Sequence, residues 1–578
     1  MADFADPRRL WTDGSALHLH GAAITRLTPG PVPTASAVDP EGVVEIAGSE
    51  FGTTLLRVDV ALGDAVGFWH PGAGWDRHLA ADWMTGWRTV GLVDSAPLGC
   101  LYDGSGRSLL GFATDRLAPS TRVRFGLGER TGRFGVWLAM DLRPGEICRV
   151  RVAAPGTEVA ETVRSLTRWQ SGAATLPVPD AGRVPAYSTW YAYHQEVGAT
   201  AIEAEAKLAA EAGCGLLILD DGWQRGAHGG GYAGCGDWEP DPEKFPDFGA
   251  HVATVRGLGL TYLAWIAPLL LGDDSAARDG LAAFAPHVKP NWRCHVLDPR
   301  HEGVRRFVVD SCVRLVDRYG LDGLKIDFLD AAMVYAGEGG DVGEAMRALL
   351  VDLRDGLRSV RGTDLLIELR QPYTGAAMRE FGNLLRAGDC PADAVGNRVR
   401  TVDLAVAGLE SAVHSDMLMW DPKAPPQAAA RQLLSVLHAV PQISVRLAEL
   451  PADHRAMTAF WLAFWREHRD VLMHGALDAG RPDELHPVVI VSDASRAVLI
   501  FHAQRHAASL DPTGFAEVAL VNNTDAERVL LDLTRPAVVR LDVSDVCGTP
   551  VRSETTRLEP GPQWLAVPPS GLCLIRPA

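Results

Sequence analysis

The middle of the chain alternates short apolar runs with amphipathic stretches, from about residue 186 to residue 447. This alternation is typical of βα units, which build a parallel sheet. Residues 200–212, for example, form an amphipathic stretch that ends at Gly213, a residue suited to terminate a helix. Eight strands are predicted, at residues 186–192, 215–221, 261–267, 322–328, 365–369, 383–387, 412–418 and 442–447. Eight such units favour a closed (β/α)8 barrel, the TIM-barrel architecture, over an open doubly wound sheet.

Both ends of the chain show short apolar runs that are interrupted by Gly, Pro and Asp about every ten residues, which is typical of antiparallel β-structure. The runs near the N-terminus are 43–46, 53–60, 89–93, 123–127, 134–140 and 147–152. Those near the C-terminus are 487–491, 497–502, 517–521, 537–541 and 571–576. The fold class is therefore α/β, with three expected domains: an N-terminal antiparallel β-sandwich (1–178), the barrel (179–475) and a smaller C-terminal all-β domain (476–578).

Composition excludes several classes of protein. Of the 578 residues, 47% are apolar and 22% are charged, which is typical of a globular protein and excludes a disordered, collagen-like or coiled-coil chain. The net charge of −17 argues against a nucleic-acid partner, because binding of a polyanion relies on clustered cations. The N-terminus lacks a signal-peptide pattern and no apolar stretch is long enough to span a membrane, so we expect a cytoplasmic protein with no membrane partner.

Polar and aromatic side chains occur at nearly every predicted strand end. In chain order they are Trp190, Tyr193, His194, Asp220, Asp221, Trp223, Trp265, Lys325, Asp327, Glu368, Arg370, Arg386, Asp389, His414, Asp416 and Arg446. One acid at a strand end is most often a helix N-cap. Barrel active sites, however, form at the carboxyl ends of the strands, and eight polar ends together predict a functional site there.

The missing motifs narrow the chemistry of this site. The sequence contains no Walker loop, no G-x-G-x-x-G after a strand, no G-x-S-x-G elbow and no H-E-x-x-H, and its nine cysteines form no C-x-x-C pair. We therefore expect no cofactor and no metal. Aromatic rings stack on sugar rings, charged groups bind sugar hydroxyls, and two opposed carboxylates can cleave a glycosidic bond. The residues thus favour a sugar-cleaving barrel.

Three ordered motifs carry a family resemblance. They are LDDGW at residues 219–223, GDW at 236–238 with KFP at 244–246, and LKID at 324–327. The chain resembles the melibiase-type α-galactosidases of glycoside hydrolase family 36, and RAGDCPAD at 386–393 is similar to the general-acid segment of that family. The resemblance covers roughly residues 185–450, and the flanking domains match in arrangement only.

The resemblance implies a retaining, exo-acting α-galactosidase with a two-aspartate double-displacement mechanism. Asp327 would be the nucleophile, with a low pKa, and Asp389 the general acid and base, with a raised pKa. Asp220 and Asp221 would bind the sugar, and so would Arg386. Lys325 would bind hydroxyls and keep Asp327 ionised.

Some assignments stay open within this implied site. Asp393 could be the acid instead, with Asp389 capping the next helix. Trp190, Trp223, Trp238 and Trp265 are candidates for stacking on the sugar, with packing as the alternative reading, and Asp416 could orient the site or bind a hydroxyl. His194 and His414 are interpreted as structural, and Glu368 with Arg370 as an ion pair under the site.

One segment departs from the family. Many members have a Cys-containing, Gly-rich segment after strand five, where this chain has ELRQPY at residues 368–373. This leaves open whether the sugar is galactose, N-acetylgalactosamine or a pentopyranose.

Several alternatives to the main hypothesis also remain. They are a related α-glycosidase or transglycosylase, a non-catalytic sugar-binding barrel, and a metal-dependent hydrolase using Asp220, Asp221, His194 and His414. The expected partner is an oligosaccharide or α-glycoside substrate. The oligomeric state stays open, with a homo-oligomer among the options.

Overall fold

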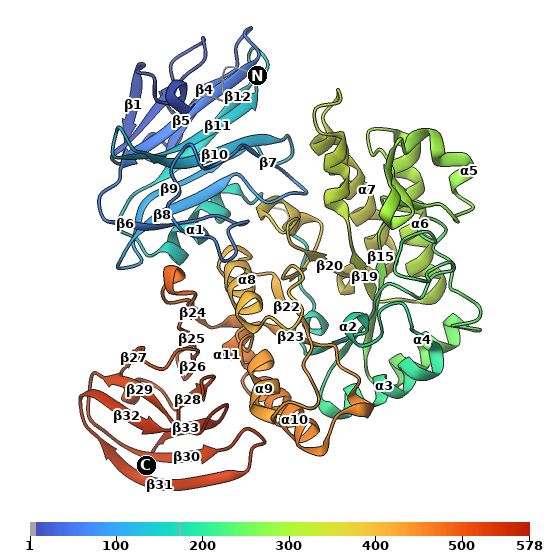
Figure 1. The fold of residues 1–578 in the computed structure, drawn as a ribbon, viewed down its shortest axis with the longest axis vertical. Coiled ribbons are helices and arrows are strands. Elements are labelled where there is room, and N and C mark those ends of the chain that lie inside the picture. The colour runs from blue at the N-terminus through green and yellow to red at the C-terminus, as the bar shows by residue number, and fades with distance from the viewer. Residues whose placement is uncertain (1–6, 173–174) are drawn as a thin grey trace.

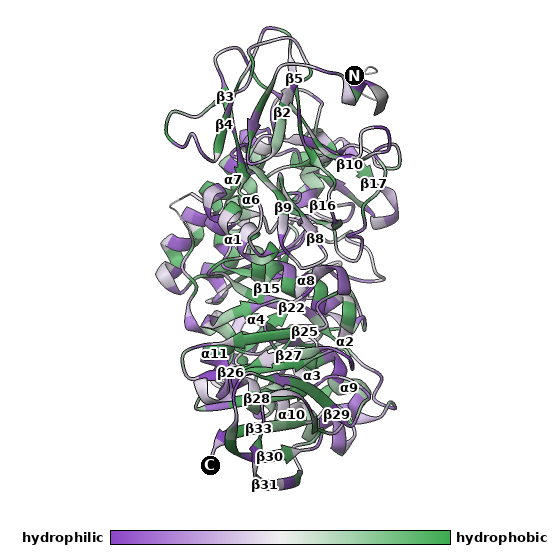
Figure 2. Cartoon of the chain, turned by 90° about the vertical axis from the view of Figure 1, so that its left-hand side faces the viewer, coloured by the Kyte–Doolittle hydropathy of each residue, from purple (hydrophilic) through white to green (hydrophobic). Residues whose placement is uncertain are grey.

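Three blocks of secondary structure follow one another in the computed structural model, which describes residues 7–172 and 175–578. Figure 1 shows N-terminal sheets in blue, a barrel surrounded by helices, and C-terminal sheets in red. In the view turned by 90°, the barrel elements lie between the two β-regions along the long axis (Figure 2). The predicted arrangement of a barrel between β-rich ends is confirmed.

The N-terminal block is a sandwich of two six-stranded antiparallel sheets, as predicted. The first sheet has the order β1 (Ala16–Leu19), β2 (Ala22–Arg26), β5 (Thr53–Ala61), β11 (Arg133–Asp141), β10 (Thr121–Gly128), β7 (Arg88–Val90). The second has the order β3 (Thr34–Ala35), β4 (Val43–Ala47), β12 (Ile147–Ala153), β9 (Ser108–Thr114), β8 (Leu98–Asp103), β6 (Ala65–Trp69). Alternate side chains of both sheets fill one apolar core, which contains Phe68, Phe112 and Phe134.

The central block is a closed parallel barrel of eight strands. The strands are β13 (Ala186–Ser188), β14 (Leu216–Leu219), β15 (Thr261–Ile266), β19 (Gly323–Ile326), β20 (Leu366–Arg370), β21 (Leu384–Arg386), β22 (Ala412–Leu418) and β23 (Val440–Ile443). Each lies at a predicted position, but all except β20 and β22 are shorter than predicted. Thr189 has helical backbone angles, so Trp190 lies in the short helix α2 (Trp190–Tyr193), and Arg446 lies beyond β23.

The helices that surround the barrel follow their strands. They are α3 (Ala199–Ala212), α4 (Phe248–Gly257), α5 (Arg278–Leu281), α6 (Glu302–Tyr319), α7 (Val342–Arg361), α8 (Ala394–Ala407), α9 (Pro426–Leu434), α10 (Ala452–Glu467) and α11 (Arg469–His474). Helix α3 ends as predicted at Gly213, whose φ of 108° is accessible to glycine at little cost. A small antiparallel sheet is inserted between β15 and β19, with the order β16 (Leu270–Gly272), β18 (Cys294–Val296), β17 (His287–Lys289).

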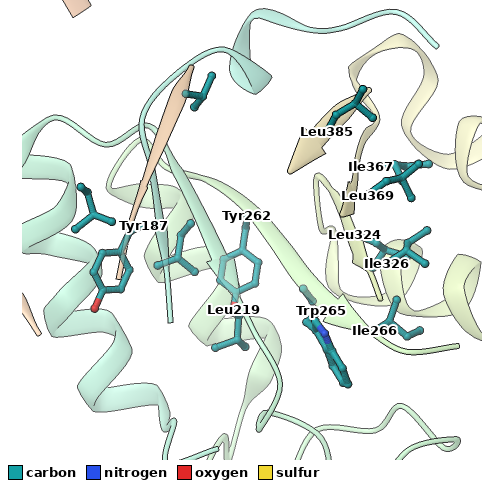
Figure 3. Packing of buried hydrophobic residues seen from close by; sticks show 14 of the residues in the cluster. Tyr187, Leu219, Tyr262, Trp265, Ile266, Leu324, Ile326, Ile367, Leu369 and Leu385 are labelled. Atoms are coloured by element: carbon teal, nitrogen blue, oxygen red, sulfur yellow. The ribbon is translucent and has the colours of Figure 1, made fainter. Parts of the chain in front are cut away.

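Successive residues of each barrel strand face opposite sides of the sheet. Outward-facing side chains such as Leu324, Ile326, Ile367 and Leu369 pack in the large core cluster, part of which is shown in Figure 3. Inward-facing side chains at the amino ends of the strands form a separate apolar layer: Ala186, Leu216, Ile218, Leu263, Leu366, Leu384 and Ala412. Polar inward-facing residues therefore begin only above this layer, toward the carboxyl ends.

The C-terminal block is all-β, as predicted. Its larger sheet has the order β24 (Ala476–Asp478), β25 (Val488–Ser492), β26 (Arg496–Phe501), β28 (Glu517–Asn522), β33 (Leu572–Pro577), β30 (Ala537–Ser544), β31 (Pro550–Leu558). Its smaller sheet has the order β27 (Ala507–Leu510), β29 (Arg528–Leu533), β32 (Gly561–Ala566). Within the described part of the chain, no helix combines the length and the apolar character needed to cross a bilayer.

A buried ion pair joins the sandwich to the barrel. Asp403 of α8 accepts hydrogen bonds from Arg77 at 2.8 Å on both carboxylate oxygens and from the Trp69 indole at 2.7 Å. Both ionised side chains are at most 5% exposed. Helix α8 follows directly after the segment that contains Asp389, so this contact also supports the polar end of β21.

We predict that Asp403→Ala lowers the free energy of unfolding by about 3–5 kcal/mol, because Arg77 is left buried without its partner. Urea-induced unfolding followed by circular dichroism measures the loss. The control is Glu302→Ala, which removes an exposed partner of Arg306 and should change stability by less than about 0.5 kcal/mol. Equal losses in the two variants would contradict the prediction.

Candidate active site

Asp327 is a buried carboxylate directly after β19. Its Oδ1 accepts from Arg370 Nε at 2.5 Å and from the backbone N–H of Phe328 at 2.7 Å, while its Oδ2 accepts from the Trp265 indole at 3.0 Å. Burial alone would raise the pKa of Asp327, but Arg370, Lys325, the Trp265 hydrogen bond and Arg386 outweigh it and lower the pKa to about 2. The side chain is therefore ionised, and this agrees with the low pKa predicted for it.

Asp220 and Asp221 follow β14, which is separated from β19 by β15 in the barrel. Lys325 Nζ lies 2.5 Å from Asp220 Oδ2, and both side chains are nearly inaccessible to solvent. Asp221 accepts hydrogen bonds from Gln195 at 2.7 Å and Gln224 at 2.6 Å. Burial, with a smaller repulsion from Asp220, raises the pKa of Asp221 to about 6 against these hydrogen bonds.

Arg386 connects two carboxylates on the other side of the barrel mouth. It ends β21, is 1% exposed, and donates to Asp389 at 2.9 Å and to Asp416 at 2.5 Å. Asp416 also accepts from the Cys390 backbone N–H at 2.7 Å and from the Tyr191 hydroxyl at 3.0 Å. Asp416 is completely buried, and these bonds hold Arg386 and the 389–390 loop in place; its binding of a substrate hydroxyl stays a prediction.

Asp389 differs from Asp327 in its exposure, since 57% of its side chain is accessible to solvent. Burial of the carboxyl and the charge of Asp327 would raise the pKa of Asp389, but Arg386 and Lys325 lower it below its usual value. The expected raised pKa is therefore wrong for the structure as it stands, because Arg386 binds the carboxylate directly. Asp393, the alternative acid, accepts from Gly396 N at 2.9 Å and is the N-cap of α8.

Three of the four tryptophans are buried, and only Trp190 is half-buried. Trp223 is completely buried, donates to the Trp265 carbonyl at 2.9 Å and stacks on Phe248. Trp238 is 3% exposed and packs edge-on against Trp265. Both pack in the core behind the site, and their contact with a sugar ring stays a prediction. Trp265 reaches Asp327 through its indole nitrogen, and Trp190 is half-buried, with its ring 5.0 Å from His194.

A second polar layer lies beneath these residues inside the barrel. Glu368 accepts from Gln442 and lies 3.5 Å from His414 and 3.8 Å from Arg386. Arg370 instead pairs with Asp327, so the predicted Glu368–Arg370 ion pair is wrong. His414 Nε2 bonds to the Gly182 carbonyl at the amino end of the barrel, away from the Asp220–Asp221 pair. The described residues include no group of three or more His, Cys, Asp or Glu side chains placed to hold a metal ion.

Several residues at the site were not predicted from the sequence. Tyr373 lies 3.2 Å from Asp327, Tyr191 binds Asp416, and Tyr232 stacks on Trp265 at 6.1 Å. Tyr232 follows a triple-glycine segment that resembles a flexible loop in the sequence. In the structure, Gln195 anchors this segment through hydrogen bonds with Gly230 and Gly231. Of these three tyrosines, only two lie near a predicted strand end in the sequence and could have been identified from it. They are Tyr191, next to Trp190, and Tyr373, three residues after a strand end.

The arrangement places a buried, ionised carboxylate at the bottom of the site and an exposed carboxylate at its rim. Two cations, Lys325 and Arg386, influence the charge of both. A pair of carboxylates at one site can cleave a glycosidic bond, one by attack and the other by proton transfer.

We predict that Trp223→Ala lowers the free energy of unfolding by about 3–5 kcal/mol, because it leaves a large cavity behind Trp265. Trp190→Ala, at a half-buried position, should cost less than about 1.5 kcal/mol. Urea-induced unfolding of both variants measures the difference. A small loss for Trp223→Ala would show that this side chain is not part of the core.

Comparison with known proteins gives local sequence similarity and extensive fold similarity. No family model matches the chain. A probable α-galactosidase G of Aspergillus terreus is 27% identical over 169 residues, and α-galactosidase AgaA of Geobacillus stearothermophilus is 30% identical over 125 residues. These matches cover 27% and 21% of this chain but only 22% and 16% of those relatives, well under two thirds of their length.

The fold matches over nearly the whole chain. The crystal structure of the GH36 α-galactosidase AgaA from Geobacillus stearothermophilus has a TM-score of 0.64 and 15% identity, over 96% of this chain and 83% of that one. The α-galactosidase TtGalA from Thermus thermophilus has a TM-score of 0.59 and 18% identity, over 85% of this chain and 99% of that one. The resemblance to the melibiase-type α-galactosidases of glycoside hydrolase family 36 is thus confirmed, and the chain has their fold.

Proposed function

We propose that this protein is a retaining, exo-acting α-galactosidase that hydrolyses terminal α-galactosides through Asp327 and Asp389. The observation that carries the proposal is Asp327 itself, a buried carboxylate kept ionised by Arg370 and Lys325, with the exposed Asp389 near enough to feel its charge. The relatives support the substrate class, because Geobacillus AgaA variants have been crystallised with raffinose and with stachyose.

Binding of the terminal sugar is assigned to the groups around Asp327. Asp220, Asp221 and Lys325 offer charged hydrogen-bonding atoms for the sugar hydroxyls, and so does Arg386, which lies between Asp389 and Asp416. The half-buried Trp190 offers a ring face for the C–H groups of the sugar, while the buried Trp265 donates to Asp327 through its indole nitrogen. Because Asp327 is only 8% exposed and Asp389 lies at the rim, the buried end suits one terminal sugar with its leaving group directed toward solvent.

In the first half of the reaction, Asp327 attacks the anomeric carbon while Asp389 protonates the departing oxygen. The charge of Asp327 raises the pKa of Asp389 in the free enzyme, although Arg386 and Lys325 outweigh that effect. Sugar hydroxyls that bind Arg386 would weaken the ion pair between Arg386 and Asp389, which raises the pKa of Asp389 and favours its protonated form.

In the second half, Asp389 removes a proton from water, which attacks the anomeric carbon and releases the sugar with its original configuration. Asp327 is then an uncharged ester, so its repulsion of Asp389 is absent. The pKa of Asp389 falls accordingly, as a general base requires.

The activity is tested with a panel of 4-nitrophenyl α- and β-glycosides of galactose, N-acetylgalactosamine and arabinopyranose. We expect hydrolysis of the α-galactoside, with α-galactose as the first product by proton NMR, and the highest kcat/KM in the panel. Raffinose with an added acceptor sugar separates hydrolysis from transfer, because transfer gives a new oligosaccharide on chromatography. A binding protein would turn over none of the panel.

The roles of the two aspartates are tested by substitution and azide rescue. Asp327→Ala should abolish turnover. Asp389→Ala should lower kcat/KM for raffinose by roughly 10²- to 10⁴-fold, and less for an aryl galactoside, whose leaving group needs little protonation. With 4-nitrophenyl α-galactoside, azide should give α-galactosyl azide from Asp389→Ala and β-galactosyl azide from Asp327→Gly.

Asp393→Ala is the matched control for the acid. It removes the N-cap of α8, which should cost about 1 kcal/mol of stability but leave turnover intact. If Asp393→Ala rather than Asp389→Ala lost activity and was rescued by azide, the assignment of the acid would be reversed.

A further inference from the structure

Arg370 is the closest cation to Asp327. It is the last residue of β20, its side chain is 15% exposed, and its Nε lies 2.5 Å from Asp327 Oδ1. Its Nη1 donates to the Gln371 carbonyl at 2.8 Å, and its Nη2 lies 3.7 Å from Asp330. The guanidinium carbon lies 5.1 Å from the ring centroid of Phe328 and 5.4 Å from that of Tyr373. The head group is thus fixed from several sides.

The position of Arg370 follows from the barrel register. Arg370 pairs with Arg386 across β20 and β21, so two arginines lie side by side at the same height. Arg386 binds Asp389 and Asp416, whereas Arg370 binds Asp327. The two candidate catalytic carboxylates therefore each have their own directly bonded arginine, and Arg386 lowers the pKa of Asp327 as well.

The two oxygens of Asp327 have different surroundings. Oδ1 accepts from Arg370 Nε and the Phe328 backbone N–H, and the Tyr373 hydroxyl lies 3.2 Å away. Among the described residues, Oδ2 accepts from one donor, the Trp265 indole. Oδ1 is therefore saturated with donors, while Oδ2 keeps lone-pair capacity for a new bond.

We propose, on the basis of the function proposed above, that Arg370 is a positioning residue for Asp327. It holds Oδ1, leaves Oδ2 as the attacking oxygen, and stabilises the carboxylate when the glycosyl-enzyme ester breaks. The Phe328 backbone N–H and the Tyr373 hydroxyl also hold Oδ1, and both are neutral. What Arg370 adds is a positive charge.

The bonds formed and broken show where this charge acts. In the first step, a lone pair of Oδ2 forms the bond to the anomeric carbon, and the electron pair of the glycosidic bond goes to the departing oxygen, which takes the proton of Asp389. Asp327 is then a neutral ester facing Arg370. In the second step, water bonds to the anomeric carbon and gives a proton to Asp389. The electron pair of the ester bond returns to Asp327 and restores its ion pair with Arg370.

The proposal predicts that loss of Arg370 slows the second step much more than the first. The ion pair stabilises the departing carboxylate, whereas in the first step the same ion pair must be given up. In Arg370→Met, kcat for 4-nitrophenyl α-galactoside should fall by about tenfold or more, the range expected for losing one charged hydrogen bond. KM should fall in parallel, so that kcat/KM stays within a fewfold of the wild-type value.

Two measurements would detect the accumulated intermediate. Stopped-flow mixing should give a burst of 4-nitrophenol close to one equivalent per enzyme in Arg370→Met and none in the wild type. Mass spectrometry of acid-quenched Arg370→Met should show a protein heavier by one hexosyl group. Arg370→Lys, which keeps the charge, should restore part of kcat and reduce the burst.

The pH profile gives a further readout that a structural role would not change. Asp327 is faced by Lys325 from β19, Arg386 from β21, Asp330 and Tyr373, and these remain in the variant. Without Arg370 the pKa of Asp327 rises, so any limb of kcat/KM that reports its ionisation moves to higher pH. Arg354→Met is the control, since Arg354 also pairs with carboxylates and lies over a ring, but on helix α7.

The outcomes separate the two proposals. If the wild type hydrolyses none of the panel glycosides, the proposed function fails. If the wild type is active but Arg370→Met shows unchanged kcat, or a fall in kcat/KM without a burst, only the role of Arg370 is overturned.

Discussion

The burial of charge at the mouth of the barrel is the constraint on which the rest of the site depends. Asp220, Asp327 and Asp416 are each at most 8% exposed, and an isolated carboxylate at such depth would not stay ionised. Each has a cation within 2.5 Å: Lys325, Arg370 and Arg386 respectively. These pairs also influence one another, because Lys325 and Arg386 both lower the pKa of Asp327 and of Asp389.

The barrel supplies the geometry for these pairs. Inward-facing positions repeat every second residue, so Leu366, Glu368 and Arg370 face the same interior at three successive heights. The lowest belongs to the apolar layer, the middle one to the buried Glu368–His414–Gln442 group, and the highest meets Asp327. Along this one strand, the residue near the amino end packs in the apolar layer and the residue at the carboxyl end contributes to the candidate active site. The Arg77–Asp403 pair then ties the sandwich to helix α8, which begins just after Asp389.

Much of the fold was predictable because it depends on local pattern. Apolar runs of strand length, helix stops such as Gly213 and the order of blocks led to the eight strands and both β-regions. Strand-end residues were also identified, because barrel topology brings all carboxyl ends to one face. Partners were harder to identify. Arg370 was matched with Glu368, its neighbour in sequence, although its partner comes from the adjacent strand.

The sequence alone thus determined which residues reach the barrel mouth. The period of two along a strand determines which side chains point into the barrel, and the motifs locate the carboxyl ends of the strands. Only the tertiary structure decided depth and pairing. Trp223 and Trp265 both come from strand ends and both are buried, yet the indole of one donates to a backbone carbonyl and that of the other to Asp327. Asp389 and Asp393 lie four residues apart, yet one meets Arg386 and the other caps a helix. The physical reason is that burial and electrostatic partners depend on contacts between strands and loops far apart along the chain, which no local pattern records.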